Sequence, residues 1–315
     1  MPRLAIWAQQ NQSCLLERAI PDGPQSDSLE VVLVGCQDEH GATALGSLLS
    51  APLCTDLREV LRSDADVVWL AAPQTLDADA RGLVRAATMP VATSSPPPAA
   101  LADLLSEPDG GMPAHFIPLL RGGAAFQSAA TALESFGLVH CVHVSATAGD
   151  HQTSRASLAL DAFDLVTYLL GEPEEVWAAH AGALPVSADP TVERSGHLTA
   201  AMRFGTERAA SITVSDGGGT WVRRVVILGE GGRIIVTDEG VSWTDPEGHS
   251  QEAPPTEGQA NAGELAGWHL RRLAAGKPPP PISLEAAIAL ESARLSCLTH
   301  QVEDPAHVRN MIGLT

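Results

Sequence analysis

The stretch Ser154–Gly171, SRASLALDAFDLVTYLLG, has the pattern of an amphipathic helix with defined ends. At 100° per residue its apolar side chains gather on one side and its polar side chains form a narrow stripe opposite. The stripe consists of Ser157, Asp161, Asp164 and Tyr168. Ser154 is placed to cap the first turn, and Gly171 with Pro173 forms a stop signal. The stripe is either a functional site or the solvated face of a surface helix, which is the commoner case.

Length and composition restrict the class of protein. A chain of 315 residues with 44% apolar residues is typical of an ordered protein of about two domains. The net charge of -19 argues against a nucleic-acid partner, because phosphate binding relies on Lys and Arg. Five scattered cysteines without a CxxC pair indicate reduced thiols in a cytoplasmic protein and no zinc site. The chain has no run of eighteen uncharged apolar residues, so we expect no membrane segment.

Short apolar runs alternate with helical patterns before this helix, which predicts a parallel, doubly wound sheet. The apolar runs are Leu4 to Ala8, Val31 to Gly35, Val67 to Ala72 and Pro90 to Thr93. The helical patterns are Leu15 to Ala19, Thr43 to Leu49, Leu57 to Leu61 and Asp77 to Ala87, with a further helix expected at about Ala99 to Leu105. Such a sheet binds its ligand at the carboxyl ends of its strands.

The pattern changes from residue 137 onward, where strand-like segments follow one another without intervening helices. These segments are Leu138 to Thr147, Glu175 to Ala183, His197 to Phe204, Ala209 to Ser215, Arg223 to Leu228 and Arg233 to Thr237. They predict an α+β domain with an open, mainly antiparallel sheet. We expect a long loop over Ser242 to Asn261 and closing helices over Gly263 to Ala275 and Leu284 to Leu298. We therefore predict two domains. Residues 1–120 form a Rossmann-like domain of the dinucleotide-binding type, and residues 121–315 form an α+β domain that binds substrate and mediates oligomerisation.

Three segments carry a resemblance to a known family: Asp64 to Pro73 (DADVVWLAAP), Asp164 to Pro173 and Ile227 to Gly232. With the order of the two predicted sheets, the chain resembles the Gfo/Idh/MocA family of sugar and polyol oxidoreductases over nearly its whole length. The resemblance implies a dinucleotide-binding domain, NAD or NADP as cofactor, a sugar-like ligand and a homo-oligomer built through the C-terminal sheet. For that oligomer we expect Val225, Ile227, Ile234 and Val236 to need cover on the exposed sheet face.

The family's cofactor positions correspond to Ala8, Gln10, Asp38, Ala72 and Pro73 in this chain. The family has a glycine-rich turn after its first strand, which lets the backbone approach the diphosphate. Here that turn reads AQQNQS over residues 8–13, without a glycine. Asp38 either holds ribose hydroxyls or serves as a turn residue.

The catalytic positions of the family are also changed. Its EKP motif corresponds to Ser94-Ser95-Pro96, so Ser95 stands at the lysine position. Its D-x-G-x-H-x-x-D signature corresponds to residues 157–164, which places Asp161 at the acid/base histidine and keeps only Asp164. Tyr168 and Arg121 are candidate substrate residues, and Arg121 is alternatively an ion-pair residue at the domain junction.

These changes leave two hypotheses. A serine hydroxyl cannot accept the proton of a substrate alcohol near neutral pH, so the chain is either a degenerate member that binds a ligand or a partner, or an oxidoreductase or lyase of altered chemistry. The second hypothesis requires Asp161 and Asp164 to act as a carboxylate dyad with raised pKa values. We predict no metal site, since His140 and His143 have an odd spacing on a strand and therefore face opposite sides.

Overall fold

The computed structural model describes residues 1–20, 28–72, 78–94, 114–149, 153–183, 185–186, 195–252 and 261–311. The chain divides into two compact units. The first comprises Met1–Pro98, Met112–Pro118 and Asn261–Pro281, and the second comprises Ala99–Gly111, Leu119–Ala260 and Ile282–Thr315. The helix expected at about 99–105 lies outside the described residues.

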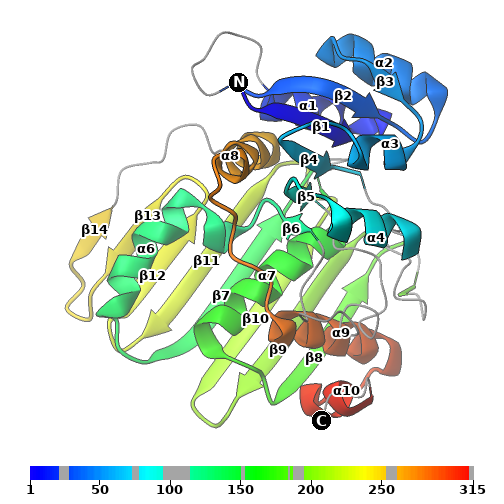
Figure 1. The fold of residues 1–315 in the computed structure, drawn as a ribbon. Coiled ribbons are helices and arrows are strands. Elements are labelled where there is room, and N and C mark those ends of the chain that lie inside the picture. The colour runs from blue at the N-terminus through cyan, green and yellow to red at the C-terminus, as the bar shows by residue number, and fades with distance from the viewer. Residues whose placement is uncertain are drawn as a thin grey trace. The chain divides into compact units, whose positions relative to one another are not determined.

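The first unit contains a six-stranded parallel sheet (Figure 1). Its strands are β1 (Arg3–Trp7), β2 (Glu30–Gly35), β3 (Leu53–Cys54), β4 (Val67–Leu70), β5 (Val91–Thr93) and β6 (His115–Phe116). The order β3-β2-β1-β4-β5-β6 is that of a Rossmann sheet. The predicted doubly wound sheet is confirmed, and β1 and β4 are buried on both faces, as continuous apolar runs require.

Helices cover this sheet on both faces. They are α1 (Ser13–Ala19), α2 (Glu39–Leu49), α3 (Leu57–Leu61), α4 (Ala78–Ala86) and α8 (Ala262–Ala274). Helix α8 follows the second sheet in the sequence and packs closely on α1. A Cβ at Gly267 would lie 2.2 Å from the carbonyl oxygen of Ala19, so only glycine permits this approach.

The second unit is built on an eight-stranded sheet of order β14-β13-β12-β11-β7-β10-β9-β8. Its strands are β7 (Val139–Thr147), β8 (Glu175–Ala181), β9 (His197–Phe204), β10 (Arg208–Ser215), β11 (Val222–Gly229), β12 (Gly232–Thr237), β13 (Val241–Thr244) and β14 (Ser250–Glu252). Neighbouring strands pair antiparallel except β7 with β10, so the predicted open sheet is confirmed.

The expectation of a long loop over 242–261 is wrong for the first half of this segment. Residues 241–252 form the hairpin β13–β14, and Trp243 donates its indole N–H to the Gly231 carbonyl at 2.8 Å. The segment is polar, but Val241 and Trp243 give it enough apolar contact to extend the sheet.

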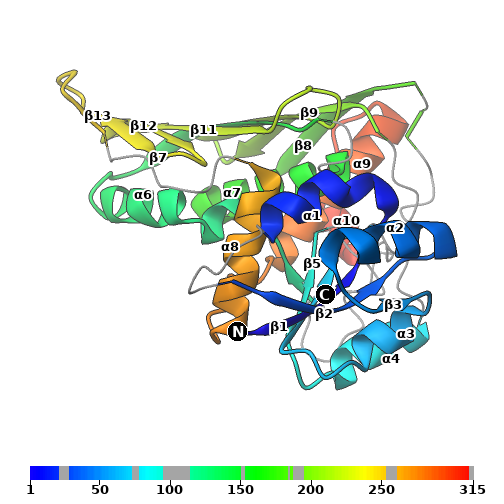
Figure 2. The same ribbon diagram turned by 90° about the horizontal axis from the view of Figure 1, so that it is seen from above.

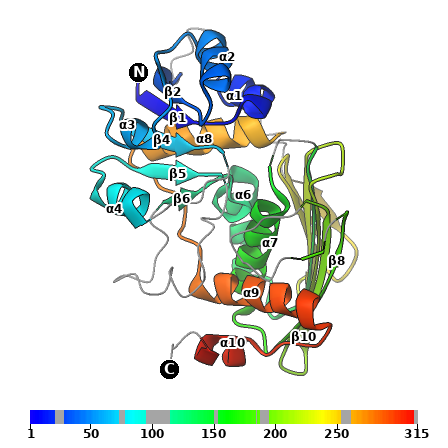
Figure 3. The same cartoon turned by 90° about the vertical axis from the view of Figure 1, so that its right-hand side faces the viewer.

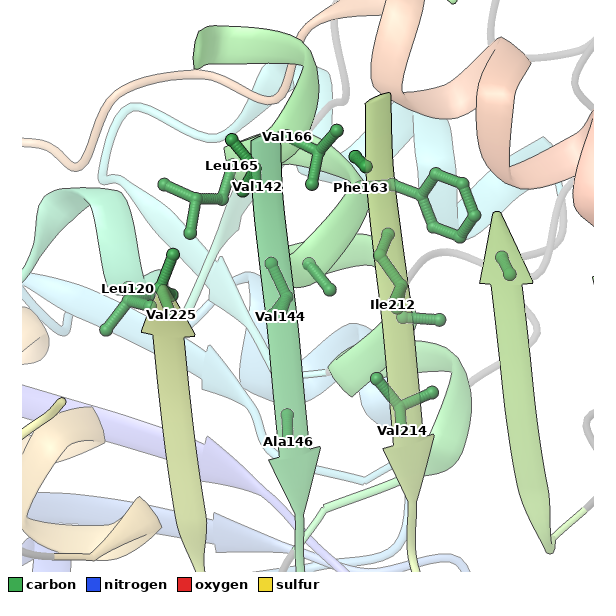
Figure 4. Packing of buried hydrophobic residues seen from close by; sticks show 14 of the residues in the cluster. Leu120, Val142, Val144, Ala146, Phe163, Leu165, Val166, Ile212, Val214 and Val225 are labelled. Carbon is green, nitrogen blue, oxygen red and sulfur yellow. The ribbon is translucent and has the colours of Figure 1, made fainter. Parts of the chain in front are cut away.

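Helices α6 (Ala124–Glu134), α7 (Arg155–Leu170) and α9 (Leu284–Thr299) lie on one face of this sheet (Figures 2 and 3). A short helix, α10 (Pro305–Met311), packs on α9. Figure 4 shows Phe163, Leu165 and Val166 of α7 packing on Val144 of β7 and Ile212 of β10. This layer is the hydrophobic core of the second unit.

The four apolar residues expected on the open sheet face lie on the other face. Val225, Ile227, Ile234 and Val236 have no exposed surface, because they are part of the core under the helices. The open face carries their strand neighbours, among them Val222, Arg224, Val226, Leu228 and Ile235. That part of the expectation is therefore wrong, since we assigned the alternation to the wrong face. Among the described residues, no helix is long and apolar enough to cross a membrane.

Candidate functional site

Helix α7 is buried on nearly all sides. Its predicted cap is present, with the Ser154 hydroxyl accepting from the Ser157 N–H at 3.1 Å. Twelve of its sixteen residues are buried, and Asp161 and Asp164 are only 5% and 1% exposed. Of the candidate residues on this helix only Tyr168 is well exposed, at 56%. The polar stripe is thus not a solvated face, and its carboxylates must have partners inside the protein.

Asp161 belongs to a buried cluster of three charges. Its Oδ2 accepts from Arg223 Nη1 at 2.5 Å, and its Oδ1 accepts from the Leu120 N–H at 2.8 Å. The same guanidinium donates to Asp238 Oδ1 through Nη2 at 2.6 Å and through Nε at 3.1 Å. The indole N–H of Trp221 donates to Asp238 Oδ2 at 2.9 Å. Arg223 thus joins α7 to strands β11 and β12 and is shared between two carboxylates.

Burial and the neighbouring charges shift the pKa values of this cluster in opposite directions. Desolvation raises the pKa of the Asp161 carboxyl, and the charge of Arg223 and the Leu120 N–H oppose that shift. The charge of Asp164 raises the pKa of Asp161 as well, but it is the weakest of these causes. Desolvation lowers the pKa of Arg223, but the charges of Asp238 and Asp161 outweigh it and raise that pKa overall.

Asp164 binds a different set of groups. Arg121 donates to it twice, through Nε at 2.7 Å and Nη2 at 2.9 Å, in a bidentate ion pair. The Ser283 N–H donates to its Oδ1 at 3.3 Å. Burial raises the pKa of Asp164, while Arg121 lowers it. Arg121 also stacks over the Tyr168 ring at 5.1 Å, so the interpretation of Arg121 as an ion-pair residue matches its geometry.

The two aspartates therefore do not share a proton or a partner. Each carboxylate faces its own guanidinium, and each guanidinium approaches from a different element of the second unit. A general base must reach a substrate proton within hydrogen-bond distance, directly or through one water. Here both oxygens of each carboxylate already accept hydrogen bonds from the protein, so this arrangement serves packing better than proton transfer.

In the first unit, the turn after β1 is closed by a glutamine side chain. Residues Gln10–Gln12 form a 3-10 turn that runs into α1. The buried Gln12 amide accepts from the Gln9 N–H at 3.0 Å and donates to the Ala71 carbonyl, just beyond β4, at 2.8 Å. The Gln12 side chain thus pairs with the Gln9 N–H of the turn and links the turn to the backbone just beyond β4.

An open cleft of about 570 Å³ lies beside this turn, at the carboxyl ends of β1 and β2. Gln9, Gln10, Asn11, Cys36, Gln37 and Asp38 line it. Asp38 is the N-cap of α2, where its Oδ1 accepts from the Gly41 N–H at 2.6 Å. This bond is the main cause that lowers the pKa of Asp38. Asp38 therefore lies in the turn that begins α2, and it also lines the cleft.

The turn beside the cleft has no glycine, whereas this fold binds a dinucleotide diphosphate through the backbone of a glycine-rich turn. The cleft lining includes one carboxylate and no Lys or Arg. Gln12 takes up the Gln9 N–H, and α1 has only seven residues, so it offers little of the dipole that favours anions at helix N-termini. Of the other positions that the family assigns to the cofactor, Ala8 and Ala72 are buried. Pro73 and the catalytic position Ser95 lie outside the described residues.

Possible metal ligands come together at one place among the described residues, the exposed β13–β14 turn. There Asp245, Glu247 and His249 lie close together, and the Asp245 carboxylate already binds the His249 ring at 3.1 Å. On β7, alternate residues from Val142 are buried under the helices. His143, on the opposite face, binds the Ser211 hydroxyl at 2.8 Å.

Sequence reasoning missed the partners of the aspartates. Arg223 is a buried cation in strand β11, where the other buried side chains are apolar. Asp238 follows strand β12. Arg223 has the same parity as Val225 and Ile227 and so lies on the same sheet face, but the alternation does not tell which face the helices cover. Gln12 had no such signal, since glutamine is common in exposed turns.

Known structures share this fold over almost their full length. No family model and no curated protein matches the sequence. An oxidoreductase from Agrobacterium radiobacter, solved with NAD+, L-tartaric acid and magnesium, is 16% identical, with a TM-score of 0.69 over 97% of this chain and 99% of that one. An NAD binding oxidoreductase from Klebsiella pneumoniae is 14% identical, with a TM-score of 0.68 over 96% and 98%.

A myo-inositol dehydrogenase from Corynebacterium glutamicum is 16% identical, with a TM-score of 0.64 over 96% of this chain and 98% of that one. The fold is thus that of Gfo/Idh/MocA-type oxidoreductases, as the three sequence segments predicted. At this level of identity the likeness concerns the fold alone, and the site has to be judged from its own residues.

Proposed function

We propose that this chain keeps the fold of a Gfo/Idh/MocA-type oxidoreductase but no longer performs NAD(P)-dependent hydride transfer, and that it acts as a ligand-binding or partner-binding protein. The main support is the position that the family resemblance assigns to the acid/base histidine. Asp161 stands there, buried, with both oxygens bound by Arg223 and by the Leu120 N–H. A carboxylate that is only 5% exposed and already paired with a cation is poorly placed to take a proton from a substrate hydroxyl.

The cofactor cleft gives independent support. Its lining has no cation, and the turn beside it has no glycine. A nicotinamide dinucleotide would meet the Gln9–Gln12 turn where the fold normally offers backbone N–H groups to phosphate. Two parts of one reaction, the proton acceptor and the hydride acceptor, are thus both lost.

The assembly we propose is a homo-oligomer through the open face of the second sheet. That face carries exposed or half-exposed apolar side chains, including Trp177, Val222, Val226, Leu228 and Ile235. A broad sheet face of this kind is a common surface for subunit packing.

Two measurements test the proposed loss of hydride transfer. Millimolar NAD(H) or NADP(H) bound with micromolar affinity would stabilise the protein by about 4 kcal/mol, so we expect no shift in thermal melting. Nicotinamide absorbance should show no turnover with sugars, polyols or their keto forms. Turnover by the wild-type protein that disappears in Asp161→Asn would overturn the proposal and assign the chemistry to the buried aspartate.

A further inference from the structure

The open face of the second sheet is divided by the size of its side chains. Strand β7 runs through the middle, with β11 and β12 on one side and β10 and β9 on the other (Figure 1). The outward residues of β11 are bulky, namely Val222, Arg224, Val226 and Leu228. Those of β10 are small, namely Ala209, Ser211 and Thr213. The face thus has a bulky half and a small half, and β7 is the border between them.

The register relates the two halves row by row. Each outward residue in the middle of β7 has a bulky neighbour on β11 and a small one on β10. The rows are Leu228 with Cys141 and Ala209, Val226 with His143 and Ser211, and Arg224 with Ser145 and Thr213. The next strands continue the His143 row, with Ile235 of β12 beside Val226 and Ala201 of β9 beside Ser211. In this row a bulky residue on one side of β7 has a small residue at the equivalent place on the other side.

A two-fold axis along β7 brings these counterparts together. In a two-fold interface the same patch of each subunit faces its own copy, and an axis along β7 exchanges the bulky and the small half. Leu228 then packs on Ala209 of the partner subunit, and large residues that face small ones interdigitate at the density of a protein interior. An axis across the strands would instead set bulky β11 on its own copy and leave a gap between the two copies of β10. Sheets that pack face to face keep their strands within about 30° of each other, so the pairs beside the axis are displaced least.

The charged side chains fit the same axis. Arg224 faces Thr213 of the partner subunit, whose hydroxyl can accept from the guanidinium. In the Cys141 row, Arg233 of β12 and Arg203 of β9 are at equivalent places. Arg203 is already bound by Glu174 at 2.7 Å and by Glu175 at 2.6 Å, so these three side chains together carry a net negative charge. Arg233 therefore meets an acidic group of the partner subunit.

We propose that the chain forms a two-fold dimer whose axis runs along β7, so that β11 of each subunit packs on β10 of the other. The inference rests on the assembly proposed above and adds to it the axis and the facing residues. Residues on a two-fold axis meet their own copies, so Cys141 lies beside Cys141 of the partner subunit.

The native cysteines test the axis. Cys141 is half-buried on the open face, Cys14 is exposed on α1, and the other three cysteines are buried. A short bis-maleimide added to the full chain at micromolar concentration should link the two Cys141 thiols and give a covalent dimer on a denaturing gel. Cys14→Ser should keep this product, and Cys141→Ser should lose it.

Exchanging the sizes of one facing pair tests the packing. Leu228→Ala leaves a gap opposite Ala209 of the partner subunit, and Ala209→Leu sets leucine against leucine. Each contact occurs twice in the dimer, so each single variant should raise the dimer Kd by at least about tenfold in analytical ultracentrifugation. The double variant only exchanges the bulky and the small residue, so its Kd should return to within about threefold of wild type.

Leu53→Ala on β3 is the matched control. Leu53 is exposed to a similar extent, 45% against 41% for Leu228, but it lies outside the open face of the second sheet. This variant should leave the dimer Kd unchanged.

A covalent dimer through Cys141, together with rescue in the double variant, supports the axis. A dimer that gives no Cys141 product, or a double variant that binds no better than the weaker single variant, refutes the axis while the assembly stands. A monomer mass at the same concentration refutes the assembly and the axis together. Nicotinamide-dependent turnover would refute the proposed loss of hydride transfer without changing this series, so the failures are distinguishable.

Discussion

Replacing Arg223 by methionine tests the buried charge cluster most directly. The substitution removes the guanidinium that Asp161 and Asp238 share, and methionine fills much of the same volume. Removing one partner from a buried ion pair costs about 3–5 kcal/mol, because the remaining charge is left uncompensated. Two carboxylates lose their partner here, so we expect a cost at the upper end of this range.

Urea unfolding followed by tryptophan fluorescence measures this cost. Burial raises the pKa of the Asp161 carboxyl, and without Arg223 the main opposing charge is gone, so the folded state binds more protons than the unfolded state. The stability of the variant therefore falls as pH rises, and the loss relative to wild type should be larger at about pH 7 than at about pH 5.

Arg203→Met is the matched control. Arg203 also binds two carboxylates, those of Glu174 and Glu175, but its side chain is 45% exposed. An exposed ion pair contributes about 0–1 kcal/mol, so this variant should remain close to wild type. Equal losses in the two variants, or a loss below about 1 kcal/mol in Arg223→Met, would contradict the structural role of the cluster.

Three further predictions concern chemistry, assembly and pH. Asp161→His should lower the melting temperature, because the imidazole would meet Arg223, and it should remain inactive with NAD(P), alone or combined with Ser95→Lys, in an absorbance assay. Light scattering at micromolar concentration should give at least the mass of a dimer, and a monomer mass would refute the assembly through the sheet. The pKa of Asp38 is lowered in the fold, so its contribution to stability is present above its unfolded pKa of about 3.9 and is lost as pH falls through the folded pKa. Melting curves between about pH 6 and pH 3 should therefore show a smaller acid loss for Asp38→Asn than for wild type.

The parallel sheet could be predicted because strands buried on both faces, such as Val67–Leu70, appear in the sequence as continuous apolar runs. The ends of α7 could be predicted for a similar reason, since Ser154 and Gly171 act on neighbouring backbone groups. Local signals of this kind depend only on residues nearby in the chain.

The environment of Asp161 depends on distant residues and could not be predicted in the same way. Its partner Arg223 is 62 positions away in the sequence. A polar stripe on a helix has the same sequence pattern whether it contacts water or a buried guanidinium. The open face of the second sheet was misassigned because alternation defines two faces but not which one the helices cover. The packing of α8 on α1 depends on Gly267, which in the sequence is one small residue among many.

The pairing of Asp161 with Arg223 also affects how this protein can evolve. A histidine at position 161 would place an imidazole beside a buried guanidinium, so acid/base chemistry by a histidine there needs a second change at position 223. Either change made first leaves a buried charge without its partner and gives a less stable intermediate. Selection for folding alone therefore disfavours a histidine at position 161, even where no other function acts on this position.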